Sequence, residues 1–157
     1  MNLYADTSAL IKKYVREAGS EQVLAQFNQY PLIGTAALTQ AEMASAMSKA
    51  VRLGWVAESE ILIAWQDFLS HWPAYIRLPI SAGVIERAAS FAWRHGLRAY
   101  DSVHLASALA WKDVTGDQVV FACYDENLLK AARGEGLQVW PESTDPNPTL
   151  TDPSRGY

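Results

Sequence analysis

The fold is decided by one stretch of the chain, Leu97-Arg98-Ala99-Tyr100-Asp101-Ser102-Val103-His104-Leu105-Ala106-Ser107-Ala108-Leu109-Ala110. Nearly every residue after Asp101 is apolar or small. This pattern predicts a helix, from about residue 99 to 114, that is buried over most of its surface. Asp101 would lie near the first turn of the helix, so the sequence predicts a carboxylate at the mouth of a buried element.

Short apolar segments alternate with helical patterns on both sides of this stretch. The segments that we expect to be strands lie at 3–6, 32–35, 75–79, 119–122 and 137–140. Buried strands separated by helices are typical of a parallel sheet that is covered on both faces. We therefore predict a three-layer α/β fold with a central parallel sheet flanked by helices. Two long helices are expected at 39–53 and 57–72, whereas a single helix is enough to connect two parallel strands. The extra helix predicts a projecting helical hairpin.

The composition indicates one soluble globular domain. Of the 157 residues, 50% are hydrophobic and 19% are charged, as in ordinary globular proteins. We assign residues 1–140 to the domain and expect the Pro-rich residues 141–157 to be a mostly disordered tail. No apolar run reaches the roughly 18 residues of a membrane span, and the first residues do not resemble a signal peptide. We therefore expect a cytoplasmic protein without a membrane partner.

The net charge of −4 at first disfavours nucleic acid as a partner. Half of this charge comes from the residues after Trp140, where three acids face one arginine. Cations bound by some of the remaining acids would permit a local basic face. The candidates for RNA phosphate contacts are Lys12, Lys13, Arg16, Lys49, Arg52 and Arg98. Most solvent-facing Lys and Arg side chains have no such role, which is the alternative for each of them.

Four acids are expected at one edge of the sheet. Asp6 ends the first strand, and Asp125 follows the strand at 119–122. Glu42 and Asp101 lie near helix starts, which open on the same edge, where sites in parallel sheets form. Two carboxylates about 4 Å apart repel by roughly 4 kcal/mol at an effective dielectric constant near 20, so the cluster needs a cation. Oxygen ligands favour Mg²⁺ or Mn²⁺, and two such ions can promote phosphodiester cleavage.

Each of these acids also has a structural explanation. Thr39-x-x-Glu42 matches a capping box, in which Glu42 only caps its own helix. Asp6, Asp101 and Asp125 are placed to act as N-terminal caps or as partners of helix dipoles. Taken one at a time, most of the acids are explained by capping, and only their joint pattern favours a metal site.

Four motifs occur in order and at suitable spacing along the chain. They are the strand end Leu3-Tyr4-Ala5-Asp6-Thr7-Ser8-Ala9-Leu10, the helix start Thr39-x-x-Glu42, the segment 97–106 and Phe121-Ala122-Cys123-Tyr124-Asp125-x-x-Leu128. Together they resemble a PIN-domain nuclease and, at this chain length, a VapC-type toxin of a toxin–antitoxin pair. The resemblance covers about residues 1–140.

The resemblance implies an endoribonuclease that depends on Mg²⁺ or Mn²⁺ and leaves a 5′-phosphate and a 3′-hydroxyl. The acidic positions of the family fall on Asp6, Glu42, Asp101 and Asp125, and its small hydroxyl residue near the metal falls on Ser8. A homodimer and inhibition by a cognate antitoxin protein are also implied. One position departs from the pattern, because Cys123 stands where the family usually has Thr or Ser. A thiol orients its neighbours less well than a hydroxyl.

Two other functions are open on the sequence alone. Cys123 and the acidic net charge are compatible with a catalytically inactive PIN-like module that binds RNA or a protein without cutting. A phospho-acceptor receiver domain would need a lysine just beyond the last strands, and no lysine lies there. The sequence therefore favours the nuclease, in which Asp6, Asp101 and Asp125 hold metal and Glu42 completes the cluster or orients a water.

Two further features are expected to serve mainly the packing of the fold. His104 follows Asp101 by three residues, and we expect a packed, hydrogen-bonded helix residue rather than a metal ligand or base. An apolar stripe at helical spacing, expected to be core, comprises Ile61, Trp65, Phe68 and Trp72. With Leu62, Ile63 and Leu69 this helix is apolar over more than half its circumference, so one face is a candidate surface for a dimer or an antitoxin.

Overall fold

Five short strands form one parallel sheet in the order β3-β2-β1-β4-β5. The computed structural model describes residues 1–144 of the chain. The strands are β1 (Asn2–Ala5), β2 (Ile33–Ala36), β3 (Ile76–Leu78), β4 (Val119–Ala122) and β5 (Gln138–Trp140). In the register, Leu3 of β1 lies between Ile33 of β2 and Val120 of β4. All pairings are parallel, so the carboxyl ends of the strands meet at one edge.

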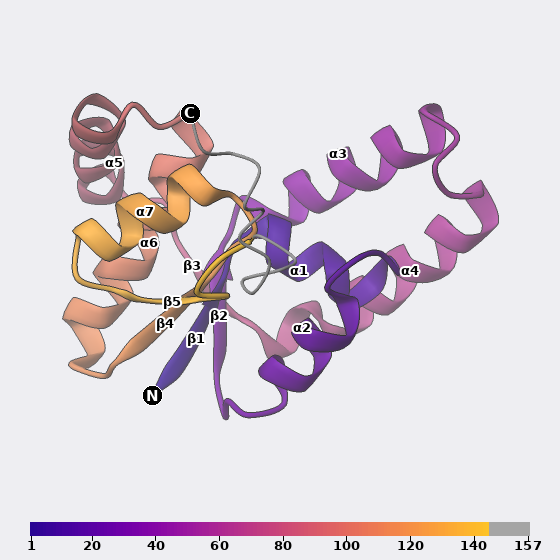
Figure 1. Cartoon of the computed structure of the whole chain (residues 1–157), viewed down its shortest axis with the longest axis horizontal. Helices are drawn as coiled ribbons and strands as arrows, with labels where there is room; N and C mark the ends of the chain where they lie inside the picture. Colours follow the sequence, from indigo (N-terminus) through magenta and orange to yellow (C-terminus); the bar gives the residue numbers. More distant parts are fainter. Residues whose placement is uncertain (145–157) are drawn as a thin grey trace, which may run out of the picture.

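Helices cover both faces of this sheet and complete the three predicted layers (Figure 1). One face carries α1 (Thr7–Tyr14), α2 (Ser20–Phe27), α3 (Thr39–Arg52), α4 (Glu58–His71) and a 3₁₀ turn (Trp72–Ala74). The other face carries α5 (Ala82–His95), α6 (Ala99–Thr115) and α7 (Glu126–Gly134). Successive strand residues point to opposite faces. Leu3 therefore packs into the core under α1–α4, and Tyr4 into the core under α5–α7.

Helix α6 is the buried element that the small-residue stretch predicts. All its residues from Ser102 to Leu109 are buried, and the helix packs against α5, β2 and β4. Because α6 leads back into the parallel strand β4, it runs opposite to the strands and begins at their carboxyl edge. Its first turn therefore places Asp101 at that edge.

Helices α3 and α4 form the predicted hairpin, which reaches away from the sheet (Figure 1). Along α4, Ile61 and Phe68 are buried in the core, and Trp72 follows in the next turn. Two further apolar residues of α4 are not buried, because Leu62 is 55% exposed and Ile63 is 63% exposed. A cleft of about 390 Å³ lies between the two helices of the hairpin.

The described part of the chain ends shortly after the sheet. The last strand stops at Trp140, and most of the tail expected at 141–157 lies outside the described residues. Within residues 1–144, no helix combines the length and the apolar surface that crossing a bilayer would take.

Candidate active site

The four acids singled out in the sequence lie at the carboxyl edge of the sheet. Asp6 follows β1 directly and caps α1, and Asp125 caps α7 just after β4. Glu42 and Asp101 lie in the first turns of α3 and α6. The structure thus brings the ends of two strands and the starts of four helices together, as predicted. It also gives Asp6 and Asp125 the capping roles that were their structural explanation.

His104 connects Asp6 with Glu42. Its Nε2 donates to Oε2 of Glu42 at 2.7 Å and lies 3.5 Å from Oδ1 of Asp6. Nδ1 of the same ring forms a hydrogen bond with the Tyr4 hydroxyl at 2.9 Å. Burial alone would lower the pKa of His104, but the charges of Asp6 and Glu42 outweigh it and raise this pKa. His104 is the packed, hydrogen-bonded residue that was expected, and it is also part of the site.

Thr7 holds the same oxygen of Glu42. Its Oγ1 donates to Oε2 of Glu42 at 2.5 Å. The capping box expected as the alternative is wrong, because α3 is capped at Leu38 without a side-chain hydrogen bond and Thr39 already lies inside the helix. Glu42 therefore points toward Asp6 instead of capping its own helix. Sequence reasoning missed Thr7, and the only signal was a hydroxyl residue directly after the strand-end acid.

Arg98 connects Asp101 with Asp125. Its Nε donates to Oδ2 of Asp101 at 2.8 Å, and a terminal nitrogen lies 3.8 Å from Oδ2 of Asp125. Oδ1 of Asp125 accepts the Leu128 amide at 2.9 Å. Burial raises the pKa of Asp101, Arg98 opposes the rise, and the charges of Asp6 and Asp125 add to it. The two acid pairs are therefore close enough to interact electrostatically.

Ser8 and Cys123 tie the two strand ends together. Oγ of Ser8 donates to Oδ2 of Asp6 at 2.5 Å and accepts the Tyr124 amide at 2.9 Å. Sγ of Cys123 lies 3.6 Å from Oγ of Ser8 and accepts the Asp125 amide at 3.1 Å. The thiol thus fills the orienting place of a hydroxyl, as a weaker acceptor. Burial, together with the charge of Asp6, raises the pKa of Cys123, which disfavours the nucleophilic thiolate form.

The donor set fits a hard divalent cation. Carboxylate oxygens are the ligands that Mg²⁺ and Mn²⁺ prefer, and a cavity of about 270 Å³ lies beside Asp101 and Asp125. Arg98 and His104 stand between the acids and supply part of the neutralising charge that such a cluster needs. Within residues 1–144, no three His, Cys, Asp or Glu side chains are gathered tightly enough to hold a metal ion as they stand. Binding of an ion would therefore require the acid side chains to move closer together.

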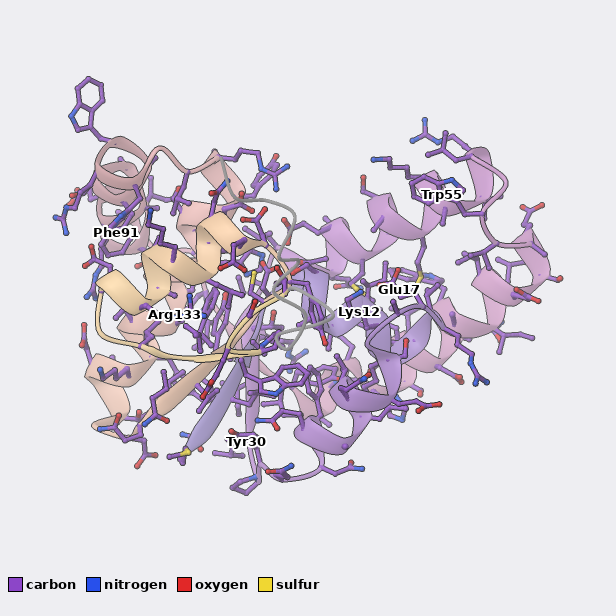
Figure 2. All side chains as sticks on the ribbon, in the orientation of Figure 1. Lys12, Glu17, Tyr30, Trp55, Phe91 and Arg133 are labelled. Carbon is purple, nitrogen blue, oxygen red and sulfur yellow. The ribbon has the colours of Figure 1, made fainter. Side chains whose placement is uncertain are left out.

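Two of the RNA-contact candidates are held by other side chains. Lys12 forms an ion pair with Glu17 at 2.9 Å, and the two lie beside each other in Figure 2. Its ammonium also lies 4.4 Å from the centre of the Tyr124 ring. Lys13 donates to the Tyr75 hydroxyl at 3.0 Å. These contacts position α1 and leave both lysines poorly placed for a phosphate.

The other basic candidates are more accessible. The side chains of Arg16 and Arg98 are 92% and 80% exposed. Lys49 is exposed on α3, with its ammonium 5.9 Å from the centre of the Trp55 ring. Arg52 lies in the cleft between α3 and α4. Two members of this set are connected with the acids, because Arg98 contacts Asp101 and Asp125 and Lys49 shares a groove with Glu42.

The fold and the acid cluster agree with a match to a known protein family. The model of the PIN domain matches residues 3–134. The chain belongs to the PIN-domain family. A relative in this family, Ribonuclease VapC45 of Mycobacterium tuberculosis, is 34% identical over 145 residues, which cover 92% of this chain and 98% of that protein. This membership sets aside the receiver domain.

Solved structures share the PIN fold. FitAcB from Neisseria gonorrhoeae superposes with a TM-score of 0.65 at 20% identity, over 87% of this chain and 95% of that one. A toxin–antitoxin complex from Klebsiella pneumoniae contains a chain that superposes with a TM-score of 0.51 at 18% identity, over 76% of this chain and 84% of that one. At these identities the likeness shows the fold alone.

Proposed function

We propose that this PIN-domain protein is an endoribonuclease that hydrolyses RNA phosphodiester bonds with Mg²⁺ or Mn²⁺, as the toxin of a toxin–antitoxin pair. The observation that carries this proposal is the meeting of Asp6, Glu42, Asp101 and Asp125 at one edge of the sheet. Membership of the PIN-domain family and the likeness to a ribonuclease over nearly the whole chain support it. The nuclease domain would comprise residues 1–140.

In the proposed site, Asp6, Asp101 and Asp125 hold the metal. A bound divalent ion would lower the pKa of a water and stabilise charge on the phosphate. Glu42 receives both of its described hydrogen bonds at Oε2, which leaves Oε1 to complete the cluster or orient the attacking water. Ser8 fixes the carboxylate of Asp6 through its hydroxyl.

The partners follow from the same assignment. The RNA substrate would approach the solvent side of the acids, where Arg98 is exposed. A cognate antitoxin follows from the resemblance of the four motifs to VapC-type toxins and from the 34% identity to Ribonuclease VapC45. We also propose a homodimer, because apolar residues such as Leu62 and Ile63 are exposed on the hairpin. The cytoplasm would be the site of action, since substrate RNA is there.

The catalytic assignment is tested by Asp6→Asn and Asp101→Asn. Each substitution keeps the shape of the side chain and removes a charged metal ligand, so RNA cleavage in Mn²⁺ should fall by at least about 100-fold, or roughly 2.7 kcal/mol of transition-state stabilisation. Cleavage is followed on total RNA. Calorimetric titration of the same proteins with Mn²⁺ should show weaker binding.

The matched control is Asp113→Asn, on α6 like Asp101 but paired with Arg87 outside the site. Its cleavage should equal that of the unchanged chain. Full activity of Asp6→Asn and Asp101→Asn in excess EDTA would contradict the proposal. Mn²⁺ binding without any RNA cleavage by the unchanged chain would instead identify the inactive binding module.

A further inference from the structure

A groove leads away from the acids along the surface of α3. It has a volume of about 460 Å³ and is lined by Leu38, Ala41, Glu42, Ser45, Ala46, Lys49 and Tyr100. Volumes of this size are typical of sites that take a small ligand. Because Glu42 belongs both to the acid cluster and to this groove, the groove is continuous with the site of the proposed reaction.

One wall of the groove is a single face of α3. Glu42, Ser45 and Lys49 are spaced at i, i+3 and i+7, so their side chains lie in a row. At 1.5 Å per residue, Lys49 lies roughly 10 Å along the helix from Glu42. The row therefore starts with a carboxylate at the reaction site and ends with an exposed ammonium.

The opposite wall is Tyr100, directly before Asp101 in α6. This tyrosine is 66% exposed, although its neighbours in the helix from Ser102 onward are buried. An exposed aromatic ring beside a nuclease site offers a flat surface on which a base can stack. Beyond Lys49, Trp55 adds a second exposed ring, which Figure 2 shows near the far end of the hairpin.

We propose that this groove holds the RNA strand next to the bond that is cut, with a base stacked on Tyr100 and a phosphate bound by Lys49. Alternating aromatic and basic side chains are what single-stranded nucleic acid requires of a binding surface. The assignment deepens the proposed ribonuclease function and rests on it. It also explains how a chain of acidic net charge binds RNA, because the contacts are local and include stacking.

The experiment measures the binding of a fluorescein-labelled, single-stranded RNA of about 12 nucleotides by anisotropy, in EDTA so that no cleavage occurs. Tyr100→Ala should weaken binding by about 5- to 150-fold, the usual cost of losing one stacked base. Tyr100→Phe keeps the ring and should bind like the unchanged chain. Trp93→Ala, which removes a ring that is 93% exposed on α5, is the matched control and should have no effect.

Lys49→Gln gives a second, independent measurement. Removing one phosphate contact should lower the slope of log K against log salt by about 0.7, the value for a single strand. Tyr100→Ala should leave this slope unchanged because stacking releases no counterion. Lys130→Gln on α7 removes the same charge outside the groove and should leave both affinity and slope unchanged.

Cleavage of the same RNA in Mn²⁺ is measured in parallel. Unchanged RNA affinity in both Tyr100→Ala and Lys49→Gln would overturn the proposal, as expected if the groove serves a protein partner. The same conclusion follows if the unchanged chain does not bind this RNA. If the unchanged chain cleaves RNA while both variants bind normally, only the groove assignment fails. If it binds through the groove but does not cleave, the proposed catalysis fails.

Discussion

The charge balance of the acid cluster depends on Arg98. Its guanidinium bonds to Asp101 and approaches Asp125 from the solvent side, where it supplies positive charge between two carboxylates. A divalent cation that binds Asp101 must compete with this guanidinium, because both positive charges are attracted to the same carboxylate and repel each other. Arg98 should therefore weaken metal binding while stabilising the metal-free protein.

Arg98→Gln should accordingly lower the dissociation constant for Mn²⁺ by about 3- to 10-fold, the range expected for an exposed ion pair with two acids. Calorimetric titration measures this constant directly. Arg87→Gln breaks a comparable Arg–Asp pair at 2.6 Å outside the site. This substitution should leave the dissociation constant for Mn²⁺ unchanged. Equal or weaker Mn²⁺ binding by Arg98→Gln would show that Arg98 does not compete with the metal.

Individual site residues differ in how far the sequence could predict them. Asp6 and Asp125 were predictable because each follows a buried strand, and such positions meet at the carboxyl edge. The contacts of Thr7 and His104 with Glu42 were not, because they join residues 35 and 62 positions apart. Contacts of this kind depend on how the helices cross the sheet, which no local pattern specifies.

At the scale of elements, the contact between β2 and α6 depends on a glycine. A Cβ at Gly34 would lie 2.5 Å from Cζ3 of Trp111, which is shorter than any real contact. The Trp111 ring is buried and fills the place that the missing side chain leaves. The absence of a side chain in β2 therefore sets how closely the central helix approaches the sheet.

Gly34→Ala should destabilise the protein by about 1–3 kcal/mol because the added methyl forces the ring or the strand to move. Urea unfolding measures this loss. The loss should shrink when Trp111 is replaced by Leu, since the methyl then enters vacated space. Gly83→Ala, whose Cβ would have no neighbour closer than 3.9 Å, is the control and should not destabilise. An equal cost of Gly34→Ala in both backgrounds would contradict the steric explanation.

An ionic contact links the ends of α5 and α7 and makes their packing sensitive to pH. Glu135 bonds to Arg94 and His95 at 2.7 Å each. Burial alone would raise the pKa of Glu135, but these two partners outweigh it and lower this pKa. The folded protein thus favours the ionised carboxylate, and the contribution to stability is present above the unfolded-state pKa of about 4.3 and lost as the pH falls through the folded-state value.

Glu135→Gln should therefore lower the free energy of unfolding by about 0.5–1 kcal/mol at pH 7 and by almost nothing near pH 3. The effect at pH 7 is small because solvent screens the ion pairs. Urea unfolding at the two pH values gives the difference. Glu86→Gln removes an exposed carboxylate from α5 and should cost less at pH 7. A cost of Glu135→Gln that is the same at both pH values would exclude the ionic explanation.

The elements themselves were largely predictable, because their patterns are local. Short apolar runs predicted the buried strands β1 and β4, and a longer run of small and apolar residues predicted the buried helix α6. The start of α3 was predicted less well. Thr39-x-x-Glu42 has the spacing of a capping box, yet Glu42 is held by Thr7 and His104. A local capping pattern is therefore overridden when side chains from other helices offer the same carboxylate stronger hydrogen bonds.

At the scale of the whole molecule, the α3–α4 hairpin is the part whose apolar residues the rest of the domain does not fully cover. It reaches away from the sheet (Figure 1), and α4 buries only one side. Leu62, which lines the cleft between α3 and α4, and its neighbour Ile63 remain exposed. Exposed apolar residues gathered on one element are typical of a surface that binds another protein, which is why we propose a homodimer.

The mass of the protein in solution tests this assembly. The unchanged chain should show twice the 17.3 kDa of one chain by light scattering, and Ile63→Asp should move the mass toward one chain, because a buried, unpaired carboxylate weakens association by about 100-fold, or roughly 2.7 kcal/mol. Val114→Asp makes the same chemical change at a residue of α6 that is 87% exposed, and it should remain a dimer. A monomeric unchanged chain would contradict the homodimer itself. A dimer that persists in Ile63→Asp would show instead that the two copies meet on another face, leaving the hairpin free for a different protein partner.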